Sequence, residues 1–308
     1  MLRTRSNIAA VGELRVRVPG SSANLGPGFD SFAVALPLLA EFELRPARVW
    51  SMVVEGDGGA PEGEKNLFLV AARATSEVAG KELPPHQVTQ RSAIPVARGL
   101  GSSAAAIVGG VVAANALLGE PFDRRTLLRI ATDVEGHPDN VAAALYGALT
   151  VALPNDAGPV ATRIAFPSAW RICLLITRQP IQTDDARAVL PKQVTREDAV
   201  FNLAHSAAMI AAVMRGDGAL LALAMADRLH QHARASLVPA LGEIIAAARE
   251  AGAFGAALSG AGPSVIAIAP ARLAPRVVAA MEEAGVTSGL PGRGRVVRAR
   301  AAGAQIRK

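Results

Sequence analysis

The sequence predicts a two-domain α+β protein, and three observations lead to this prediction. The chain has 308 residues, enough for one large domain or two of ordinary size. Segments with the apolar spacing of strands alternate along it with segments that have helical spacing. A cluster of Pro, Asn, Asp and Gly at 154–169 interrupts both patterns. We therefore place the domain boundary there, with domains at residues 1–160 and 161–308.

The first domain is expected to mix strands and helices. Residues 14–18 alternate apolar and polar side chains, as a half-buried strand does, and a turn-rich segment is expected from 19 to 28. The strongest helix signal spans residues 102–118, because it begins at serines and ends at Gly119, shortly before Pro121. The other expected elements are strands at 32–44, 48–54, 87–92 and 145–153 and helices at 66–79 and 124–134.

The second domain is expected to contain more helix. Residues 265–269 form an uninterrupted apolar run, which predicts a buried strand. The other expected elements are strands at 171–176 and 295–301 and helices at 197–214, 217–228, 239–251 and 273–284.

The composition predicts a folded, cytoplasmic protein. Apolar residues make up 51% of the chain, too many for a disordered protein. Cys173 is the only cysteine, so no internal disulfide can form, and the first residues lack the apolar region of a secretory signal. The longest apolar run, 104–119, is shorter than a membrane span and contains Asn115, which favours a buried helix and no membrane partner.

The net charge of +6 raises the possibility of a nucleic-acid partner. The basic residues are nearly all arginines, however, and no aromatic residues alternate with them as they do where bases stack. We therefore expect no nucleic-acid partner, but a solvated surface that also attracts anionic substrates such as ATP. The basic residues gather only near the end of the sequence, at Arg293, Arg295, Arg298, Arg300, Arg307 and Lys308.

A glycine- and serine-rich loop stands directly before the apolar helix expected at 102–118. Glycines let backbone N–H groups approach an oxyanion, and a helix N-terminus adds unpaired donors and partial positive charge. These features favour a phosphate site, although a glycine-capped loop before a core helix is the purely structural alternative. The loop consists of Pro95, Val96, Ala97, Arg98, Gly99, Leu100, Gly101, Ser102, Ser103, Ala104 and Ala105.

The loop matches neither common nucleotide-binding motif. The sequence contains no G-x-x-x-x-G-K-[ST], which excludes a P-loop nucleotide hydrolase. No G-x-G-x-x-G follows a first strand with an acidic residue about 20 positions later, which argues against a dinucleotide site.

Two further loops place this one in a family. Residues 18–30 contain Ser-Ala-Asn-Leu-Gly-Pro-Gly-Phe-Asp, and residues 258–264 read Leu-Ser-Gly-Ala-Gly-Pro-Ser. Three such loops in this order resemble the GHMP kinases, which phosphorylate galactose, homoserine, mevalonate and phosphomevalonate. Within that family the sequence is most similar to the bacterial homoserine kinases, through Glu-Gly-His-Pro-Asp-Asn-Val-Ala at 135–142 and Thr-Asp-Asp-Ala-Arg-Ala-Val-Leu-Pro at 183–191. The similarity covers roughly residues 14 to 270.

The resemblance implies a two-domain GHMP kinase fold, with an N-terminal domain like domain 2 of ribosomal protein S5 and a ferredoxin-like α/β-sandwich C-terminal domain. It implies ATP-dependent phosphorylation of the L-homoserine hydroxyl, a step toward threonine. A kinase for another small alcohol, such as L-threonine, is the nearest alternative. A non-catalytic binding protein is another, although it would be expected to have lost Glu135, Asp139 or the loop serines. A homodimer is also possible.

The resemblance also implies which residues hold the nucleotide. The loop at 95–105 would surround the phosphates of ATP, and Asn66 would lie near the adenine. Glu135 with Ser102 or Ser103 would bind Mg²⁺, because one carboxylate and one hydroxyl, completed by water, suit a hard octahedral ion.

An amino-acid acceptor requires an acidic group for its ammonium and a cationic group for its carboxylate. Arginine suits the latter because its planar fork binds a carboxylate through two hydrogen bonds. The resemblance assigns Asn24 and Asp30 to the ammonium and hydroxyl side and Arg187 and Arg234 to the carboxylate side. It adds Thr183 to the same substrate site.

The resemblance places His137, Asp139 and Asn140 near the reacting hydroxyl. A carboxylate is a much weaker base than an alkoxide, so Asp139 cannot deprotonate an alcohol fully before transfer. It either accepts the proton late, in a loose transition state, or only orients the hydroxyl while the γ-phosphate takes the proton.

The third loop is expected to close over the site from the second domain. Its members with that role are Ser259, Gly260 and Gly262; a tight turn between a helix and a buried strand is the structural alternative. The sequence departs from the family before Arg234. Homoserine kinases commonly carry His-x-Pro-Tyr-Arg there, whereas residues 230–234 are His-Gln-His-Ala-Arg.

Overall fold

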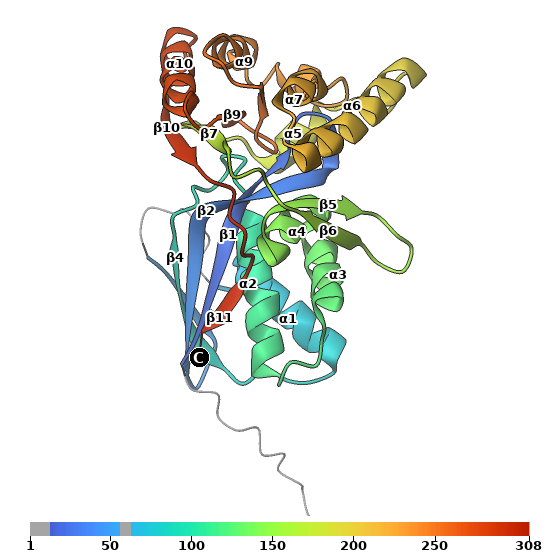
Figure 1. Cartoon of the computed structure of the whole chain (residues 1–308). Helices are drawn as coiled ribbons and strands as arrows, with labels where there is room; N and C mark the ends of the chain where they lie inside the picture. Colours follow the sequence, from blue (N-terminus) through green and yellow to red (C-terminus); the bar gives the residue numbers. More distant parts are fainter. Residues whose placement is uncertain (1–12, 56–62, 308) are drawn as a thin grey trace, which may run out of the picture.

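The computed structural model describes residues 13–55 and 63–307, and its strands form two sheets (Figure 1). The larger sheet has the order β11-β1-β2-β4-β3, and β5 joins β2 to β6. Its strands are β1 (Leu14–Asn24), β2 (Gly28–Pro46), β3 (Ser51–Glu55), β4 (His86–Ser92), β5 (Leu149–Leu153), β6 (Val160–Ile164) and β11 (Gln305–Arg307). The smaller, antiparallel sheet has the order β10-β7-β9-β8, formed by β7 (Trp170–Thr177), β8 (Gly255–Leu258), β9 (Val265–Pro270) and β10 (Gly292–Val297).

Helices cover one face of the larger sheet, and other helices lie above and to one side of the smaller sheet (Figure 1). With the larger sheet lie η1 (Gly63–Lys65), α1 (Leu67–Ala79), α2 (Ser102–Leu117), α3 (Arg124–Glu135) and α4 (Asp139–Tyr146). With the smaller sheet lie α5 (Thr183–Ala188), α6 (Arg196–Arg215), α7 (Gly218–Ala224), α8 (Gln231–Arg234), α9 (Leu241–Glu250) and α10 (Ala274–Thr287). This mixture of sheets and helices confirms the predicted α+β class. Within the described residues, no helix is both long and apolar enough to cross a membrane.

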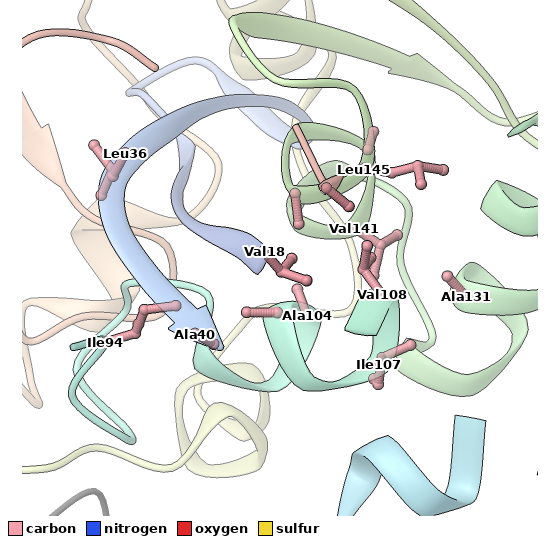
Figure 2. Packing of buried hydrophobic residues seen from close by; sticks show 14 of the residues in the cluster. Val18, Leu36, Ala40, Ile94, Ala104, Ile107, Val108, Ala131, Val141 and Leu145 are labelled. Atoms are coloured by element: carbon pink, nitrogen blue, oxygen red, sulfur yellow. The ribbon is translucent and has the colours of Figure 1, made fainter. Parts of the chain in front are cut away.

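Helix α2 is the centre of the main core. Apart from Ser102 and Ser103 at its start, every residue of the helix is buried. Two glycines allow this close packing: a Cβ at Gly110 would lie 2.2 Å from the Phe68 carbonyl oxygen, and one at Gly109 2.6 Å from the Phe42 ring. Figure 2 shows side chains of β1, β2, α2, α3 and α4 gathered in this core. Helix α2 follows the glycine- and serine-rich loop at 95–105, which we call the phosphate loop, and the core packs around the helix on all sides.

The structure corrects two expectations about local structure in the first domain. The segment expected to be turn-rich is largely strand, because β1 continues to Asn24; its pairing with β2 shifts register between Pro19 and Ser21. Proline has no N–H to donate to a neighbouring strand, so a strand tolerates a proline at a bulge such as this register shift. The strand expected at 145–153 begins only at Leu149, because α4 occupies the preceding residues.

The second domain departs from expectation at two places. Helix α7 ends at Ala224 and not at residue 228. The strand expected at 295–301 stops at Val297, and the chain then crosses back to the larger sheet, where the Arg300 N–H donates to the Ala35 carbonyl at 2.8 Å. Strand β11 then pairs antiparallel with β1. Of the basic residues near the end of the sequence, Arg293 and Arg295 therefore lie in the smaller sheet and Arg307 lies in the larger one, while Lys308 lies outside the described residues.

Candidate active site

A cavity of about 250 Å³ lies where loops of both sheets meet. Most of the predicted site residues line it: Asn24, Asp30, Asn66, Val96, Ala97, Arg98, Gly99, Leu100, Gly101, Ser102, Ser103, Glu135, His137, Asp139, Asn140, Thr183, Arg187, Arg234 and Gly260. Five predicted residues do not line it: Pro95, Ala104, Ala105, Ser259 and Gly262. Ala104 and Ala105 are instead fully buried in the core, because the first turn of α2 already points them toward the sheet.

The phosphate loop has a backbone that only glycine adopts without strain at two positions. Gly99 and Gly101 have φ of 68° and 70°. A Cβ at Gly99 would lie 2.0 Å from the Ser259 carbonyl oxygen, and one at Gly101 2.2 Å from Ser21 Oγ. Gly101 is also the N-cap of α2 and brings no side chain to the first-turn N–H groups. These donors and the helix dipole therefore act at the cavity.

Arg98 fixes the phosphate loop to the smaller sheet. Its guanidinium donates to the carbonyls of Thr177 and Val96, each at 3.0 Å, and to that of Arg178. The Ile181 N–H donates to the Ala97 carbonyl at 3.0 Å and ties the same loop to the segment before α5. The side chain of Arg98 thus acts on protein carbonyls, and the loop meets the cavity chiefly through its backbone.

The loop between β8 and β9 connects the other two loops. The Ser259 hydroxyl donates to the Gly99 carbonyl at 2.6 Å and lies 2.7 Å from Ser22 Oγ. Since Ser259 has one hydroxyl hydrogen, Ser22 is the donor of that second bond. The Gly260 N–H donates to the Ala23 carbonyl at 3.1 Å. This loop joins two strands, which corrects the alternative of a turn between a helix and a strand.

Glu135 and Ser103 bring a carboxylate and a hydroxyl together beside the phosphate loop. Ser103 Oγ donates to Glu135 Oε1 at 2.7 Å, while Ser102 lines the same cavity. The Glu135 side chain is 8% exposed, and burial raises its pKa. A buried carboxylate whose charge is poorly compensated by protein is a suitable ligand for a divalent cation. The donor set therefore fits Mg²⁺.

His137, Asp139 and Asn140 form one hydrogen-bonded group at the start of α4. Asp139 Oδ1 lies 2.7 Å from His137 Nδ1 and accepts from the Asn140 N–H, also at 2.7 Å. Burial disfavours protonated His137, but the hydrogen bond and charge of Asp139 and the charge of Glu135 outweigh it and raise the His137 pKa. Among the described residues, none donates to Asp139 Oδ2. That oxygen is the one able to meet a substrate hydroxyl.

Asp30 and Arg187 form a two-pronged ion pair beside His137 and Asp139, since ligand atoms of Asp30, His137 and Asp139 all lie within 4.8 Å of one another. Arg187 Nη2 donates to Asp30 Oδ1 at 2.8 Å, and Nη1 to Oδ2 at 3.1 Å. Asn24 orients Asp30, because its Oδ1 accepts from the Asp30 N–H at 3.1 Å and its Nδ2 donates to the Gly260 carbonyl at 3.0 Å. Asn24 and Asp30 both have positive φ, 68° and 53°, conformations that Asn and Asp tolerate better than most residues.

Arg234 lies beside this pair but is buried. It donates to the Ala186 carbonyl at 3.0 Å, to the Gly260 carbonyl at 3.1 Å and to His230 Nδ1 at 3.2 Å. Burial, reinforced by the charge of Arg187, lowers its pKa to about 10. His230 Nε2 donates to the Gly26 carbonyl at 2.9 Å, so the ring carries its proton on Nε2 and leaves Nδ1 to accept. Burial lowers the His230 pKa, which favours this neutral form.

Sequence reasoning missed several residues that build the acceptor side. Phe29 stacks on His230, with ring centroids 5.3 Å apart, and lies below the guanidinium groups of Arg187 and Arg234 at 5.8 and 5.4 Å. Asp227 accepts from the N–H groups of residues 229–231 and so fixes the start of α8. The aromatic residue inside the first loop was a visible signal, whereas the long-range role of Asp227 had none.

Asn66 has a structural role, the N-cap of α1, that the sequence pattern did not reveal. Its side chain caps α1 by accepting from the Phe68 N–H at 2.9 Å, and its Nδ2 donates to Gln90 at 3.2 Å. Both Asn66 and Gln90 line the cavity, together with Gln182, Ile181 and other residues that the sequence did not single out. These four side chains are uncharged, unlike those of Asp30, Arg187 and Arg234 in the same cavity.

Comparisons with known proteins agree over most of the chain. A family model described as the GHMP kinases N terminal domain matches residues 66–148, and one described as GHMP kinases C terminal matches residues 209–287. A protein of Moorella thermoacetica named homoserine kinase is 42% identical over 276 residues, 88% of this chain and 93% of that protein. A homoserine kinase of Deinococcus radiodurans is 45% identical over 253 residues, 82% of each chain. The crystal structure of homoserine kinase from Cytophaga hutchinsonii is similar with a TM-score of 0.88 at 28% identity, covering 97% of this chain and 98% of that one.

Proposed function

The chain belongs to the GHMP kinase family, and we propose that it transfers the γ-phosphoryl group of ATP to the side-chain hydroxyl of L-homoserine. The product is O-phospho-L-homoserine, an intermediate on the way to threonine. One observation carries the proposal: a single cavity joins a glycine-rich helix N-terminus to an acidic residue and two arginines. The first binds phosphate, and the second set matches both charges of a free amino acid. The two-domain fold of the family is as expected from the sequence.

The acceptor end recognises a zwitterion. Asp30 attracts the ammonium, and Arg187 and Arg234 attract the carboxylate. In the present structure Asp30 and Arg187 neutralise each other. An incoming amino acid exchanges this one ion pair for two, so neither charge loses its partner on binding. Mevalonate has a carboxylate but no ammonium, so its binding to Arg187 would leave Asp30 uncompensated, and a sugar offers neither charge; both comparisons support an amino acid as acceptor.

Transfer requires positioning more than covalent chemistry. The acceptor oxygen bonds to Pγ while the bond from Pγ to the bridging oxygen breaks, and ADP leaves with that electron pair. The hydroxyl proton goes either to Asp139 Oδ2 or to the transferred phosphoryl group. In both cases His137 and the Asn140 N–H hold Asp139 Oδ1 in place, so that Oδ2 faces the hydroxyl.

Glu135 and Ser103 would hold Mg²⁺, with Ser102 beside them. When bound, the ion supplies positive charge that offsets the charge of the phosphate oxygens. Glu135 must be ionised for this role, and a cation would compensate the burial that otherwise raises its pKa.

Release of ADP, measured with homoserine, threonine, mevalonate, shikimate and galactose as separate acceptors, tests the proposal. We expect the highest kcat/KM with homoserine. Stimulation by threonine alone would move the activity to threonine, and stimulation by none of the acceptors would exclude a kinase for these alcohols.

A further inference from the structure

Gln90 is a polar side chain on the buried side of strand β4. Residues 86, 88 and 90 of this strand are buried, while the residues between them are more exposed. Gln90 itself is 3% exposed and lines the active-site cavity. A buried amide costs free energy unless its polar atoms form hydrogen bonds, so a glutamine at such a position calls for partners on both sides of its amide.

The orientation of the Gln90 amide is fixed from the start of α1. The Phe68 N–H donates to Asn66 Oδ1 at 2.9 Å, which leaves the Nδ2 end of the Asn66 amide to donate. Asn66 Nδ2 donates to Gln90 Oε1 at 3.2 Å, so Nε2 of Gln90 lies on the other side of its amide. Two side-chain amides in series thus transfer the direction of one backbone N–H to Gln90.

The Gln90 amide still has hydrogen-bonding capacity for a ligand. Within residues 13–55 and 63–307, no atom accepts a hydrogen bond from Gln90 Nε2. This nitrogen is not enclosed by protein either, so it is open to the cavity that Gln90 lines. Gln90 Oε1 can accept a second hydrogen bond, because a carbonyl oxygen has two lone pairs and Asn66 uses one. The amide therefore offers a ligand one donor and one acceptor.

The lining of the cavity indicates where the base of the nucleotide lies. This step rests on the proposed function, because it takes ATP as the phosphoryl donor. The phosphates belong at the start of α2, and the charges of Asp30 and Arg187 belong to the acceptor. A flat, uncharged base suits the remaining, uncharged part of the lining. That part includes Asn66, Leu67, Gln90, Val96 and Ala106.

We propose that Gln90 determines which base this kinase accepts. Adenine has a 6-amino donor beside a ring-nitrogen acceptor, N1 on one edge and N7 on the other. Gln90 Oε1 accepts from the 6-amino group, and Nε2 donates to the ring nitrogen. Guanine and hypoxanthine have an oxygen at position 6, which would face Oε1 as acceptor against acceptor. Because Asn66 keeps the amide from turning over, Gln90 selects adenine.

The preference between nucleotides tests the role of Gln90. With saturating homoserine, kcat/KM is measured for ATP and for inosine triphosphate (ITP), whose base is hypoxanthine. We expect wild type to prefer ATP by roughly tenfold to a hundredfold, mainly through KM. Gln90→Met is apolar and of similar size, and should reduce the preference to less than about threefold. The matched control is Gln87→Met, the same change at an exposed residue of the same strand, which should keep the wild-type preference.

Asn66→Asp tests the fixed orientation of the amide. Aspartate still accepts from the Phe68 N–H and caps α1, but it has no hydrogen to donate to Gln90 Oε1. The Gln90 amide should then turn over, donate to the new carboxylate and present Nε2 to position 6 of the base. We expect the ratio of kcat/KM for ATP to that for ITP to fall by at least about tenfold, with a gain in kcat/KM for ITP itself. Loss of packing alone would produce no such gain.

A measurement on wild type alone adds a test that needs no variant. Purine riboside triphosphate lacks the 6-amino group and should lose roughly tenfold in kcat/KM relative to ATP. Equal use of this nucleotide or of ITP by wild type would overturn the role of Gln90.

The variants give further outcomes, and circular dichroism shows that each one is folded. An unchanged preference in Gln90→Met, or an equal loss in Gln87→Met, would overturn the role of Gln90. No gain for ITP in Asn66→Asp would overturn the fixed orientation. Failure of wild type to phosphorylate homoserine with any of these nucleotides would instead overturn the proposed function, on which this inference rests.

Discussion

The phosphate end of the cavity is built from backbone, whereas the acceptor end is built from charged side chains. Gly99 and Gly101 contribute through φ angles and close approach, and the only arginine in that loop is turned onto protein carbonyls. At the other end, Asp30 and Arg187 contribute through charge, and the buried guanidinium of Arg234, which also donates to backbone carbonyls, lies beside them. Under the proposed function, the two substrates would therefore be held by different physical means. Variants at the two ends should therefore fail in different ways.

The largest effect is expected from Gly99→Ala at the backbone end. The new Cβ would lie 2.0 Å from the Ser259 carbonyl oxygen at a φ of 68°, so the loop has to shift. We expect kcat/KM for ATP to fall by about a hundredfold or more, which is about 2.7 kcal/mol. Steady-state ADP release measures this. The control is Gly80→Ala, with a φ of 61° and no described atom within 4 Å of its Cβ; an equal loss there would remove the steric explanation.

Arg187→Ala should weaken the binding of homoserine at the charged end of the cavity instead. Loss of the two-pronged contact to the substrate carboxylate is expected to cost about 2 kcal/mol, or roughly a thirtyfold rise in KM for homoserine. KM for ATP should change little. The same assay with one substrate varied at a time separates the two constants. Arg73→Ala, which removes an exposed pair with Glu64, is the control. Equal effects on both KM values would contradict the division of the cavity into two ends.

Asp139→Asn tests the place where the two ends meet. The substitution keeps the shape and removes the negative charge beside the reacting hydroxyl. We expect kcat to fall by at least about tenfold while the protein stays folded. Exposed Asp133 on α3 provides the control variant, Asp133→Asn. A kcat close to that of wild type would exclude a base role for Asp139 and leave proton transfer to the phosphoryl group.

The pH dependence of stability should show whether protonated His137 forms an ion pair with Asp139. The folded state raises the His137 pKa, so it binds a proton that the unfolded state has lost. The resulting stabilisation is full below the ordinary histidine pKa of about 6.5 and disappears as the pH rises through the folded pKa. Wild type should therefore exceed His137→Gln in Tm by more at pH 6 than at higher pH. This pH dependence should shrink in an Asp139→Asn background, and its persistence there would point to another partner.

Glu135→Gln should give the smallest effect, a small change in Tm, and this change should be an increase in stability. Burial raises the Glu135 pKa, so the ionised carboxylate destabilises the fold at any pH above the ordinary glutamate value. The amide removes that charge and keeps a hydrogen-bond acceptor for Ser103. We expect the Tm without nucleotide and Mg²⁺ to rise by roughly 2–4 °C, or about 1 kcal/mol, while activity falls. A lower Tm would show that the charge is well compensated by the protein alone.

The sequence predicted the elements whose signals are local. Helix α2 was predicted nearly to the residue, because serines, a continuous apolar run and Gly119 mark it without help from the rest of the chain. The glycines and serines of the loop before it predicted a phosphate site, and the resemblance to known kinases predicted the acceptor residues; the structure brings most of these residues to one cavity. Local chemistry was sufficient in these cases.

The remaining features depend on residues far apart in the sequence. Strand β1 continues past Pro19 because β2 pairs with it, a contact that overrides the local preference for a turn. Helix α4 has only eight residues, and β11 only three, too few for a periodic pattern. The packing of α2 against α3 decides which serine contacts Glu135. The position of β7 decides that Arg98 donates to carbonyls of the smaller sheet.

The pairing of β11 with β1 sets an order of events during synthesis. Residues 14–24 leave the ribosome early, but their partner at 305–307 leaves it only after the smaller sheet has been translated. Until then this edge of the larger sheet has unpaired backbone N–H and C=O groups, which can pair with other nascent chains. Arg15 and Arg17, opposite residues 305–307 in the register, place charge on that edge during the interval. Translation that stops after β10 would leave both sheets formed but the edge open, so truncation there should favour aggregation over loss of fold.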